Sequence, residues 1–150
     1  MSNTINWGKI QGLSYSPETN LTGTAAAPSF SNLKSISLDG VDDFVDCGDN
    51  NNLSFGDGSS DSPFSISTWV KIGRTTAQGI VTKYGSGSST REYTFYTTGG
   101  KLRLLFIDAS NGANNFATGT TTFATDTWYH VACTYDGRGG STAYNGITLY

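Results

Sequence analysis

The residues of this sequence that could do chemistry gather first in the stretch SISLDGVDDFVDCGD, residues 35–49, which holds five of the chain's 12 acidic residues. Asp39, Asp42 and Asp43 surround a glycine, and turn carboxylates and carbonyls of this kind are ligands that calcium prefers. Asp136, in the later run YDG, could supply a fourth carboxylate. The spacing departs from the EF-hand loop, which carries a glutamate at its twelfth position. Calcium binding is therefore one of two interpretations of this stretch.

The second interpretation needs no metal ion. In it, Asp39 and Asp42 cap a turn with their side chains, as aspartates commonly do. Asp43 and Asp46 then face solvent beside a buried Phe44. The sequence alone leaves both interpretations open.

Few residues in this chain suit catalysis. Retaining glycosidases need two carboxyl groups about 5 to 5.5 Å apart, and the only glutamates, Glu18 and Glu92, lie in separate parts of the sequence. A serine hydrolase would have to use His130, the single histidine, which lies in the strand-like run WYHVACTYD. Packing explains this histidine better, and no GxSxG motif accompanies it. We therefore expect no catalytic residues and a protein that is not an enzyme.

Two predicted loops carry side chains that could bind a sugar. A glycan site needs an aromatic ring to stack on a pyranose, and amides or hydroxyls for its polar groups. The runs KYGSGSSTREY and DASNGANNFATG supply them. The candidates are Tyr84, Arg91, Asn111, Asn114, Asn115 and Phe116. Ordinary polar loops have the same composition, so a purely structural interpretation stays open.

The composition argues against several classes of partner. The formal net charge is −3, and the nine basic residues are spread singly, whereas nucleic-acid binding relies on clustered Lys and Arg. No apolar run approaches the roughly 18 residues of a membrane-spanning helix. The first residues, MSNTINWGKI, lack the plan of a secretory signal. We expect neither nucleic acid nor membrane insertion, and synthesis in a cytoplasm.

Short alternating runs between turn signals predict an all-β protein. In FSISTWVKI, every second residue from Phe64 to Ile72 lies on one face of a strand. Comparable runs are KSISLDG, FVDCGD, GIVTKY, EYTFYTT, KLRLLFID, WYHVACTYD and GITLY. The pair Gly99-Gly100 is typical of a tight hairpin. This spacing predicts a two-sheet antiparallel β-sandwich, with Trp69 and Trp128 in its core.

The 150 residues suffice for one such domain, which we place at 30–150 after a polar N-terminal arm at 1–29. Trp7, the large aromatic of the arm, is a candidate for docking on a partner or on its own domain. Cys47 and Cys133 lie in separate strand-like runs. Two separate buried thiols are the favoured interpretation, although the sequence does not exclude a disulfide.

The order of these runs resembles the laminin G-like group of concanavalin A-like jelly rolls. The matching stretches are SLDGVDDFVDCGD, PFSISTWVK, GIVTKYG, GGKLRLLFI and DTWYHVACTYDG before GITLY. The resemblance covers residues 30–150 and implies the fold, but the fold serves lectins, adhesion modules, enzyme appendages and virus surface proteins alike. Many of the relatives bind calcium. In the family, further strands follow the one that ends here at Tyr150, so we expect a piece of a longer protein, or else an edge covered by assembly.

A second, shorter resemblance concerns the opening NTINWGKI, which is similar to the start of some marine tailed-phage structural proteins. It predicts a non-enzymatic virion surface component, a capsid decoration, fibre or tail protein made in the host cytoplasm. Its expected partners are other virion proteins, copies of itself and a host cell-surface glycan, and calcium is the one expected cofactor. The alternative is a carbohydrate-binding appendage of a larger secreted glycoside hydrolase or adhesin.

Overall fold

The computed structural model describes residues 34–57, 60–85, 90–108 and 113–150. Contacts within the chain define two units, Met1–Ser37 and Leu38–Tyr150. In the first unit, the described residues 34–37 form neither helix nor strand. The expected arm at 1–29 and the docking candidate Trp7 lie outside the described residues.

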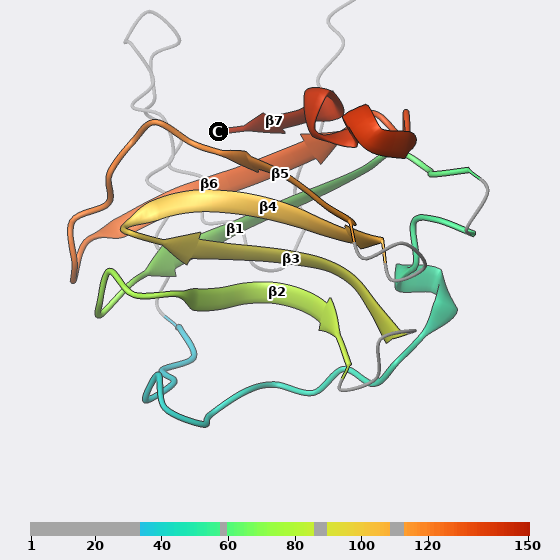
Figure 1. Ribbon diagram of the computed structural model, residues 1–150. Helices are drawn as coiled ribbons and strands as arrows, with labels where there is room; N and C mark the ends of the chain where they lie inside the picture. The colour runs from blue at the N-terminus through green and yellow to red at the C-terminus, as the bar shows by residue number, and fades with distance from the viewer. Residues whose placement is uncertain (1–33, 58–59, 86–89, 109–112) are drawn as a thin grey trace, which may run out of the picture. The chain divides into compact units, whose positions relative to one another are not determined.

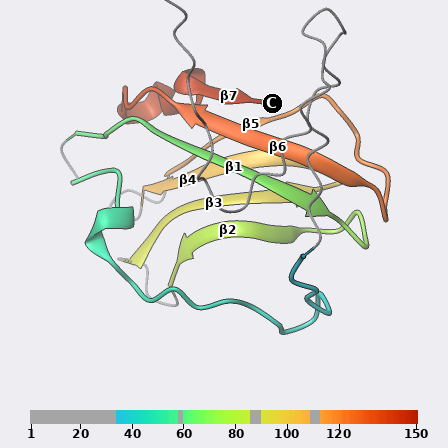
Figure 2. The same cartoon turned by 180° about the vertical axis from the view of Figure 1, so that it is seen from behind.

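The second unit contains two antiparallel sheets (Figure 1). One has the strand order β2-β3-β4-β5 and the other the order β1-β6-β7. The strands are β1 (Phe64–Lys71), β2 (Gln78–Tyr84), β3 (Arg91–Thr98), β4 (Lys101–Asp108), β5 (Ala113–Thr118), β6 (Trp128–Tyr135) and β7 (Ile147–Leu149). Two short 3-10 segments, η1 (Asn51–Leu53) and η3 (Gly140–Gly146), accompany them. The four-stranded sheet lies in front in Figure 1, and β1 and β6 lie in front in the reverse view of Figure 2. The predicted two-sheet antiparallel β-sandwich is confirmed.

Side-chain alternation explains why the strands pack as they do. Along β1, Phe64 at one end and Ile72 just past the other are buried, while Ser65 and Ser67 between them are exposed. The predicted inner face of this strand is therefore confirmed. The predicted hairpin is confirmed as well, because Gly99 and Gly100 have φ angles of 58° and 70° and join β3 to β4.

The core lies between the two sheets. Phe95 and Leu104 from the four-stranded sheet and Val131 and Cys133 from β6 are almost completely removed from solvent. Burial raises the pKa of the Cys133 thiol to about 11, so this cysteine is an inert packing residue. Apolar burial on this scale is the main stabilising contribution to the fold. Among the described residues, no helix is long and apolar enough to cross a membrane.

The stretch between 34 and 49 departs from the sequence prediction. The runs KSISLDG and FVDCGD form no strand, and Phe44 and Val45 are 78% and 61% exposed rather than buried. Aspartate side chains take up backbone N–H groups here, as when Asp46 accepts a hydrogen bond from the N–H of Gly48 at 2.8 Å. Such local bonds compete with the bonds of a strand ladder. Cys47 is a free thiol, as expected, but it is exposed.

Candidate functional site

The outer face of the four-stranded sheet brings a row of polar and aromatic side chains together. Because Phe95 and Leu104 point into the core, their sequence neighbours point outward. The strand register then pairs Tyr96 of β3 with Arg103 of β4, and Arg103 with Thr118 of β5. Phe116, two residues before Thr118, lies on the same face. We call Tyr96, Arg103, Phe116 and Thr118 the Arg103 cluster.

The guanidinium of Arg103 is held by every other member of the cluster. Its Nε donates a hydrogen bond to the Thr118 Oγ1 at 2.8 Å, and its Nη1 donates a longer one to the Tyr96 hydroxyl at 3.4 Å. Its Cζ lies 4.4 Å from the ring centroid of Phe116 and 5.9 Å from that of Tyr96. A cation over an aromatic ring at such distances contributes about 0.5–1 kcal/mol at an exposed site. The cluster is therefore an ordered surface, although Phe116 is still 47% exposed.

The glycan candidates predicted from the sequence do not all meet. Asn114 is exposed and lies on the same face of β5 as Phe116, whereas Asn115 pairs with Phe106 and faces the sandwich interior. Tyr84 and Arg91 stack on each other, with the Arg91 Cζ 4.8 Å from the Tyr84 ring centroid. They belong to β2 and β3, so Tyr84 is separated from β5 by about three inter-strand spacings, or about 14 Å. Asn111 lies outside the described residues.

The two tryptophans predicted in the core are exposed, and that prediction is wrong. Trp69 is 49% and Trp128 46% exposed, on the outer face of the three-stranded sheet. Both occupy the positions of β1 and β6 that alternate with the buried ones. His130 lies two residues after Trp128 on β6 and pairs with Trp69 across the sheet. The ring centroids of Trp69 and His130 are 5.3 Å apart. The His130 Nε2 is 2.8 Å from the Ser67 Oγ.

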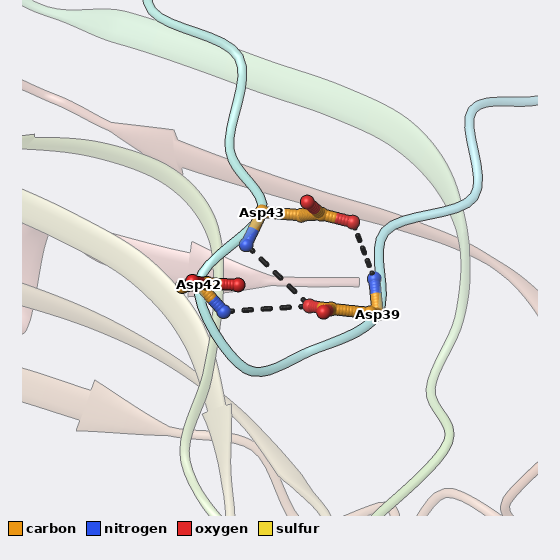
Figure 3. Close-up of side chains that lie close together, drawn as sticks. All are labelled: Asp39, Asp42 and Asp43. Atoms are coloured by element: carbon orange, nitrogen blue, oxygen red, sulfur yellow. Dashed lines mark hydrogen bonds between the residues drawn. The ribbon is translucent and has the colours of Figure 1, made fainter.

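Figure 3 shows the carboxylates of Asp39, Asp42 and Asp43 around one turn. Oxygens from all three lie within 4.8 Å of one another. The Asp39 Oδ1 accepts the N–H of Val41 at 2.7 Å and, over longer distances, those of Asp42 and Asp43. These donors, that of Val41 foremost, lower the pKa of Asp39. Asp39 thus caps the turn, as the metal-free interpretation predicts.

The fourth calcium candidate does not belong to this group. The Asp136 carboxylate accepts hydrogen bonds from the Arg138 guanidinium, and this contact lowers the pKa of Asp136. Asp39, Asp42 and Asp43 form the group that could hold a metal ion, but some of their carboxylate oxygens already accept hydrogen bonds. Asp43, for example, accepts the N–H of Asp39 at 3.0 Å. The Asp42 carboxylate accepts no hydrogen bond from a described residue. Calcium binding at Asp39, Asp42 and Asp43 stays a prediction.

If calcium binds weakly here, with a Kd of about 1 mM, a concentration of about 10 mM should stabilise the fold by about 1.4 kcal/mol. We expect the melting temperature to rise by a few degrees with calcium and to fall again with a chelator. Asp42→Asn should abolish the response, because it removes a charge without breaking the turn's hydrogen bonds. Asp136→Asn, outside the group, is the control. A melting temperature that is unchanged by both calcium and chelator contradicts the proposed calcium site.

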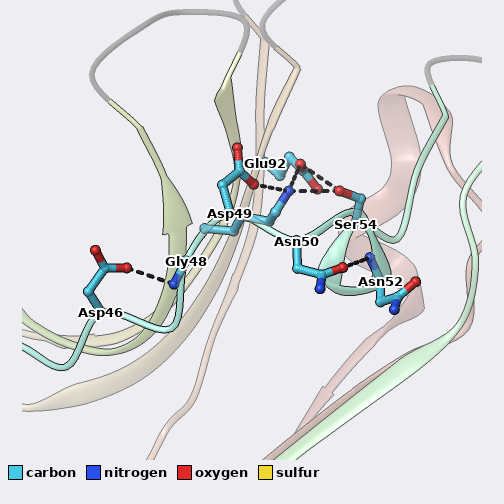
Figure 4. Close-up of polar contacts among 8 residues, drawn as sticks. Asp46, Gly48, Asp49, Asn50, Asn52, Ser54 and Glu92 are labelled. Carbon is cyan, nitrogen blue, oxygen red and sulfur yellow. Dashed lines mark hydrogen bonds and ion pairs between the residues drawn. The ribbon is translucent and has the colours of Figure 1, made fainter.

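A partly exposed ion-pair network includes Glu92, one of the two glutamates (Figure 4). The Lys83 Nζ contacts the Glu92 Oε1 at 2.5 Å and the Asp49 Oδ1 at 2.9 Å, and it donates to the Ser54 Oγ at 2.7 Å. The Ser54 hydroxyl in turn donates to Glu92. The bond to Glu92 is the largest cause of the raised pKa of Lys83. This network ties the segment before β1 to β2 and β3, so its carboxylates serve the structure.

The comparisons with known proteins agree with this architecture. A laminin G family model, described as the concanavalin A-like lectin/glucanases superfamily, matches residues 39–149. The chain belongs to this superfamily, and its sandwich is of the concanavalin A-like jelly-roll class. It is therefore a carbohydrate-binding or structural module in the general sense. Searches of curated proteins and of solved structures found no significant match.

Proposed function

We propose that this chain is a non-enzymatic glycan-binding module and that the sugar stacks on the Arg103 cluster. The observation that carries the proposal is the half-exposed ring of Phe116, fixed beside polar groups on the outer face of a sheet. Sugars are recognised by an aromatic ring against the C–H face of a pyranose and by polar groups at its edge. The cluster supplies both from rigid strands.

Polar groups surround the ring in a way that suits sugar hydroxyls. The Thr118 and Tyr96 hydroxyls each accept a hydrogen bond from Arg103 and keep their own O–H as a donor. Asn114, exposed on the same face of β5, adds an amide with both donors and an acceptor. Strand residues hold such groups more firmly than loop residues, which reduces the entropy lost on binding.

A non-enzymatic role is supported by how the remaining chemistry is used. The Glu92 carboxylate is bonded to Lys83 and Ser54, so it is not free to act as an acid or a nucleophile. Ser67 and His130 are within hydrogen-bond distance, as in a nucleophile and its base. In the described part of the chain, however, no carboxylate bonds to His130 to orient it.

For the setting, we propose the surface of a virus particle, where the module would serve as a decoration, fibre or tail component. The support is the similarity of NTINWGKI to the start of tailed-phage structural proteins. The rival setting is a carbohydrate-binding appendage of a secreted hydrolase or adhesin. Mass spectrometry of purified particles tests the virion setting, and a catalytic domain encoded in the same reading frame would favour the rival.

Phe116→Ala should weaken binding to any glycan found on an array by about tenfold or more, because burying an aromatic ring contributes about 1.5–3 kcal/mol. The matched controls are Trp69→Ala and Trp128→Ala, which remove exposed aromatics from the opposite sheet. Each variant is first checked for a cooperative thermal unfolding transition, so that binding is compared between folded proteins. Loss of binding in the tryptophan variants, with Phe116→Ala unaffected, would move the site to the other face.

A further inference from the structure

We infer that the ligand of the Arg103 cluster is an acidic glycan, one that carries a carboxylate or a sulfate, and that Arg103 recognises this anion. The inference rests on the proposed function and specifies the class of sugar. It follows from three observations: Arg103 has unused hydrogen-bond donors, it has no counter-ion among the described residues, and it lies beside the stacking ring.

Several N–H donors of Arg103 make no hydrogen bond to a described residue. A guanidinium carries five N–H groups and accepts nothing. Within the described residues Arg103 makes two hydrogen bonds, one from Nε and one from Nη1, so its Nη2 donates to no described group. Thr118, Tyr96 and Phe116 hold the plane of the guanidinium in place. A fixed, planar set of donors is the form in which arginine binds carboxylates and sulfate-like anions best.

The charge of Arg103 is also uncompensated among the described residues. Lys83 is paired with Asp49 and Glu92, and Arg138 with Asp136, whereas Arg103 makes no ion pair there. Lys101 lies two residues earlier on the same outer face of β4 and likewise forms no ion pair with a described residue. A chain with a net charge of −3 thus presents, on one sheet face, two cations that no described acidic residue pairs with. Charge complementarity favours an anionic ligand for this face.

The position of the guanidinium relative to the ring defines how the ligand would lie. The Arg103 Cζ lies over the Phe116 ring, 4.4 Å from its centroid, so an oxyanion bound at Nη2 brings the sugar that carries it against the exposed part of this ring. A uronic acid presents its carboxylate at the edge of the pyranose ring, and a sulfated sugar presents its ester there too. Both deliver an oxyanion to the same donors, so the shared chemistry is an oxyanion on a stacked pyranose.

The test uses the full chain and five immobilised ligand types: neutral oligosaccharides, uronate-containing ones, the same uronates after reduction of the carboxyl group, sulfated oligosaccharides, and their desulfated forms. Kd values are measured at low and at high salt. We expect the wild type to bind at least one acidic type about tenfold or more tightly than its neutralised counterpart, since charge-assisted hydrogen bonds are about twice as strong as neutral ones. High salt should reduce this preference.

Substitutions then assign the preference to Arg103. Arg103→Gln should remove the preference for acidic over neutralised ligands, measured as the ratio of their Kd values, and Arg103→Lys should retain part of this preference as a point charge. Arg138→Gln, which removes an arginine already paired with Asp136, is the matched control and should leave the preference unchanged. The two Arg103 variants are compared with the wild type in thermal unfolding, so that a folding defect in one is recognised from the other.

The outcomes separate this inference from the proposed function. If neutral and acidic ligands bind equally, or if Arg103→Gln keeps the preference, the inference is overturned and the glycan module stands. If no sugar of any type binds, both are overturned. Sensitivity to carboxyl reduction identifies a uronate, and sensitivity to desulfation identifies a sulfated sugar.

Discussion

Phe95→Ala is expected to lower the free energy of unfolding by about 3–5 kcal/mol, the range for truncating a buried phenylalanine. Phe95 lies at the centre of β3 and has no exposed surface. It packs in the core with Leu104, Val131 and Cys133, so the cavity left by the ring is lined from both sheets. Rigid strands on either side limit how far this cavity can close. Urea unfolding followed by fluorescence measures the change.

The same substitution on the other side of the sheet is the control. Phe116→Ala removes an identical ring from an outer-face position that is about half exposed, and we expect a loss of about 1 kcal/mol or less. Equal losses for the two variants would mean that the sheet does not have the inner and outer faces described above, and that the proposed binding surface is part of the core.

Gly137→Ala is expected to destabilise the fold by about 3 kcal/mol. Gly137 has a φ of 78°, in the left-handed region, where an L-residue costs about 1–2 kcal/mol. A Cβ here would lie 2.8 Å from the Pro63 backbone nitrogen and 2.9 Å from the Ser62 carbonyl carbon. Neither backbone atom can rotate away, so the overpacking adds a further cost of about 1–3 kcal/mol.

The surroundings of Gly137 leave little room for adjustment. The hydroxyl of the buried Tyr135 donates to the Asp61 Oδ2 at 2.6 Å and accepts the N–H of Gly139 at 2.7 Å. Burial, assisted by the bond to Asp61, raises the pKa of Tyr135 to about 12. Both sides of the turn after β6 are thus attached to the segment that enters β1.

Gly99→Ala is the matched control for the glycine prediction. Its φ of 58° is also left-handed, but a Cβ there meets nothing within 4 Å. It should cost only the backbone contribution, about 1–2 kcal/mol. Melting temperatures of the two variants, measured under the same conditions, show whether Gly137→Ala costs more stability than Gly99→Ala. If Gly99→Ala proves as harmful as Gly137→Ala, the close approach of Gly137 to Pro63 does not exist.

Much of the fold could be predicted because local patterns and tertiary structure agree. The alternation from Phe64 to Ile72 and the hairpin at Gly99-Gly100 each depend on neighbouring residues alone, and both are confirmed. The failed strands between 34 and 49 looked equally regular in sequence. There the side chains of Asp39 and Asp46 bond to nearby N–H groups, a competition that hydrophobic patterning does not reveal.

The exposed tryptophans show a signal that was present in the sequence. If Phe64 and Val70 face the core, the two-residue period of a strand places Trp69 on the opposite face with Ser65 and Ser67. The general tendency of tryptophan to be buried predicts the opposite orientation, and in this strand the alternation determines the outcome.

The Arg103 cluster was only partly predictable. Phe116 and Asn114 were named for their chemistry, and counting back from the Gly99-Gly100 hairpin pairs Tyr96 with Arg103. The pairing of Arg103 with Thr118 depends on the register between β4 and β5, which the connecting loop does not specify in sequence. Tyr84 has the same stacking chemistry as Phe116, but the sheet order separates β2 from β5.

The central claim is that glycan is bound on the outer face of the four-stranded sheet. The most direct measurement is a backbone amide NMR titration, in which an oligosaccharide that binds in the assays above is added to the isotope-labelled chain. We predict that the resonances that move most belong to Tyr96, Arg103, Phe116 and Thr118, while those of Trp69 and His130 on the opposite sheet stay in place. Shifts confined to Trp69, Trp128 and His130, with the Arg103 cluster unmoved, would contradict the account.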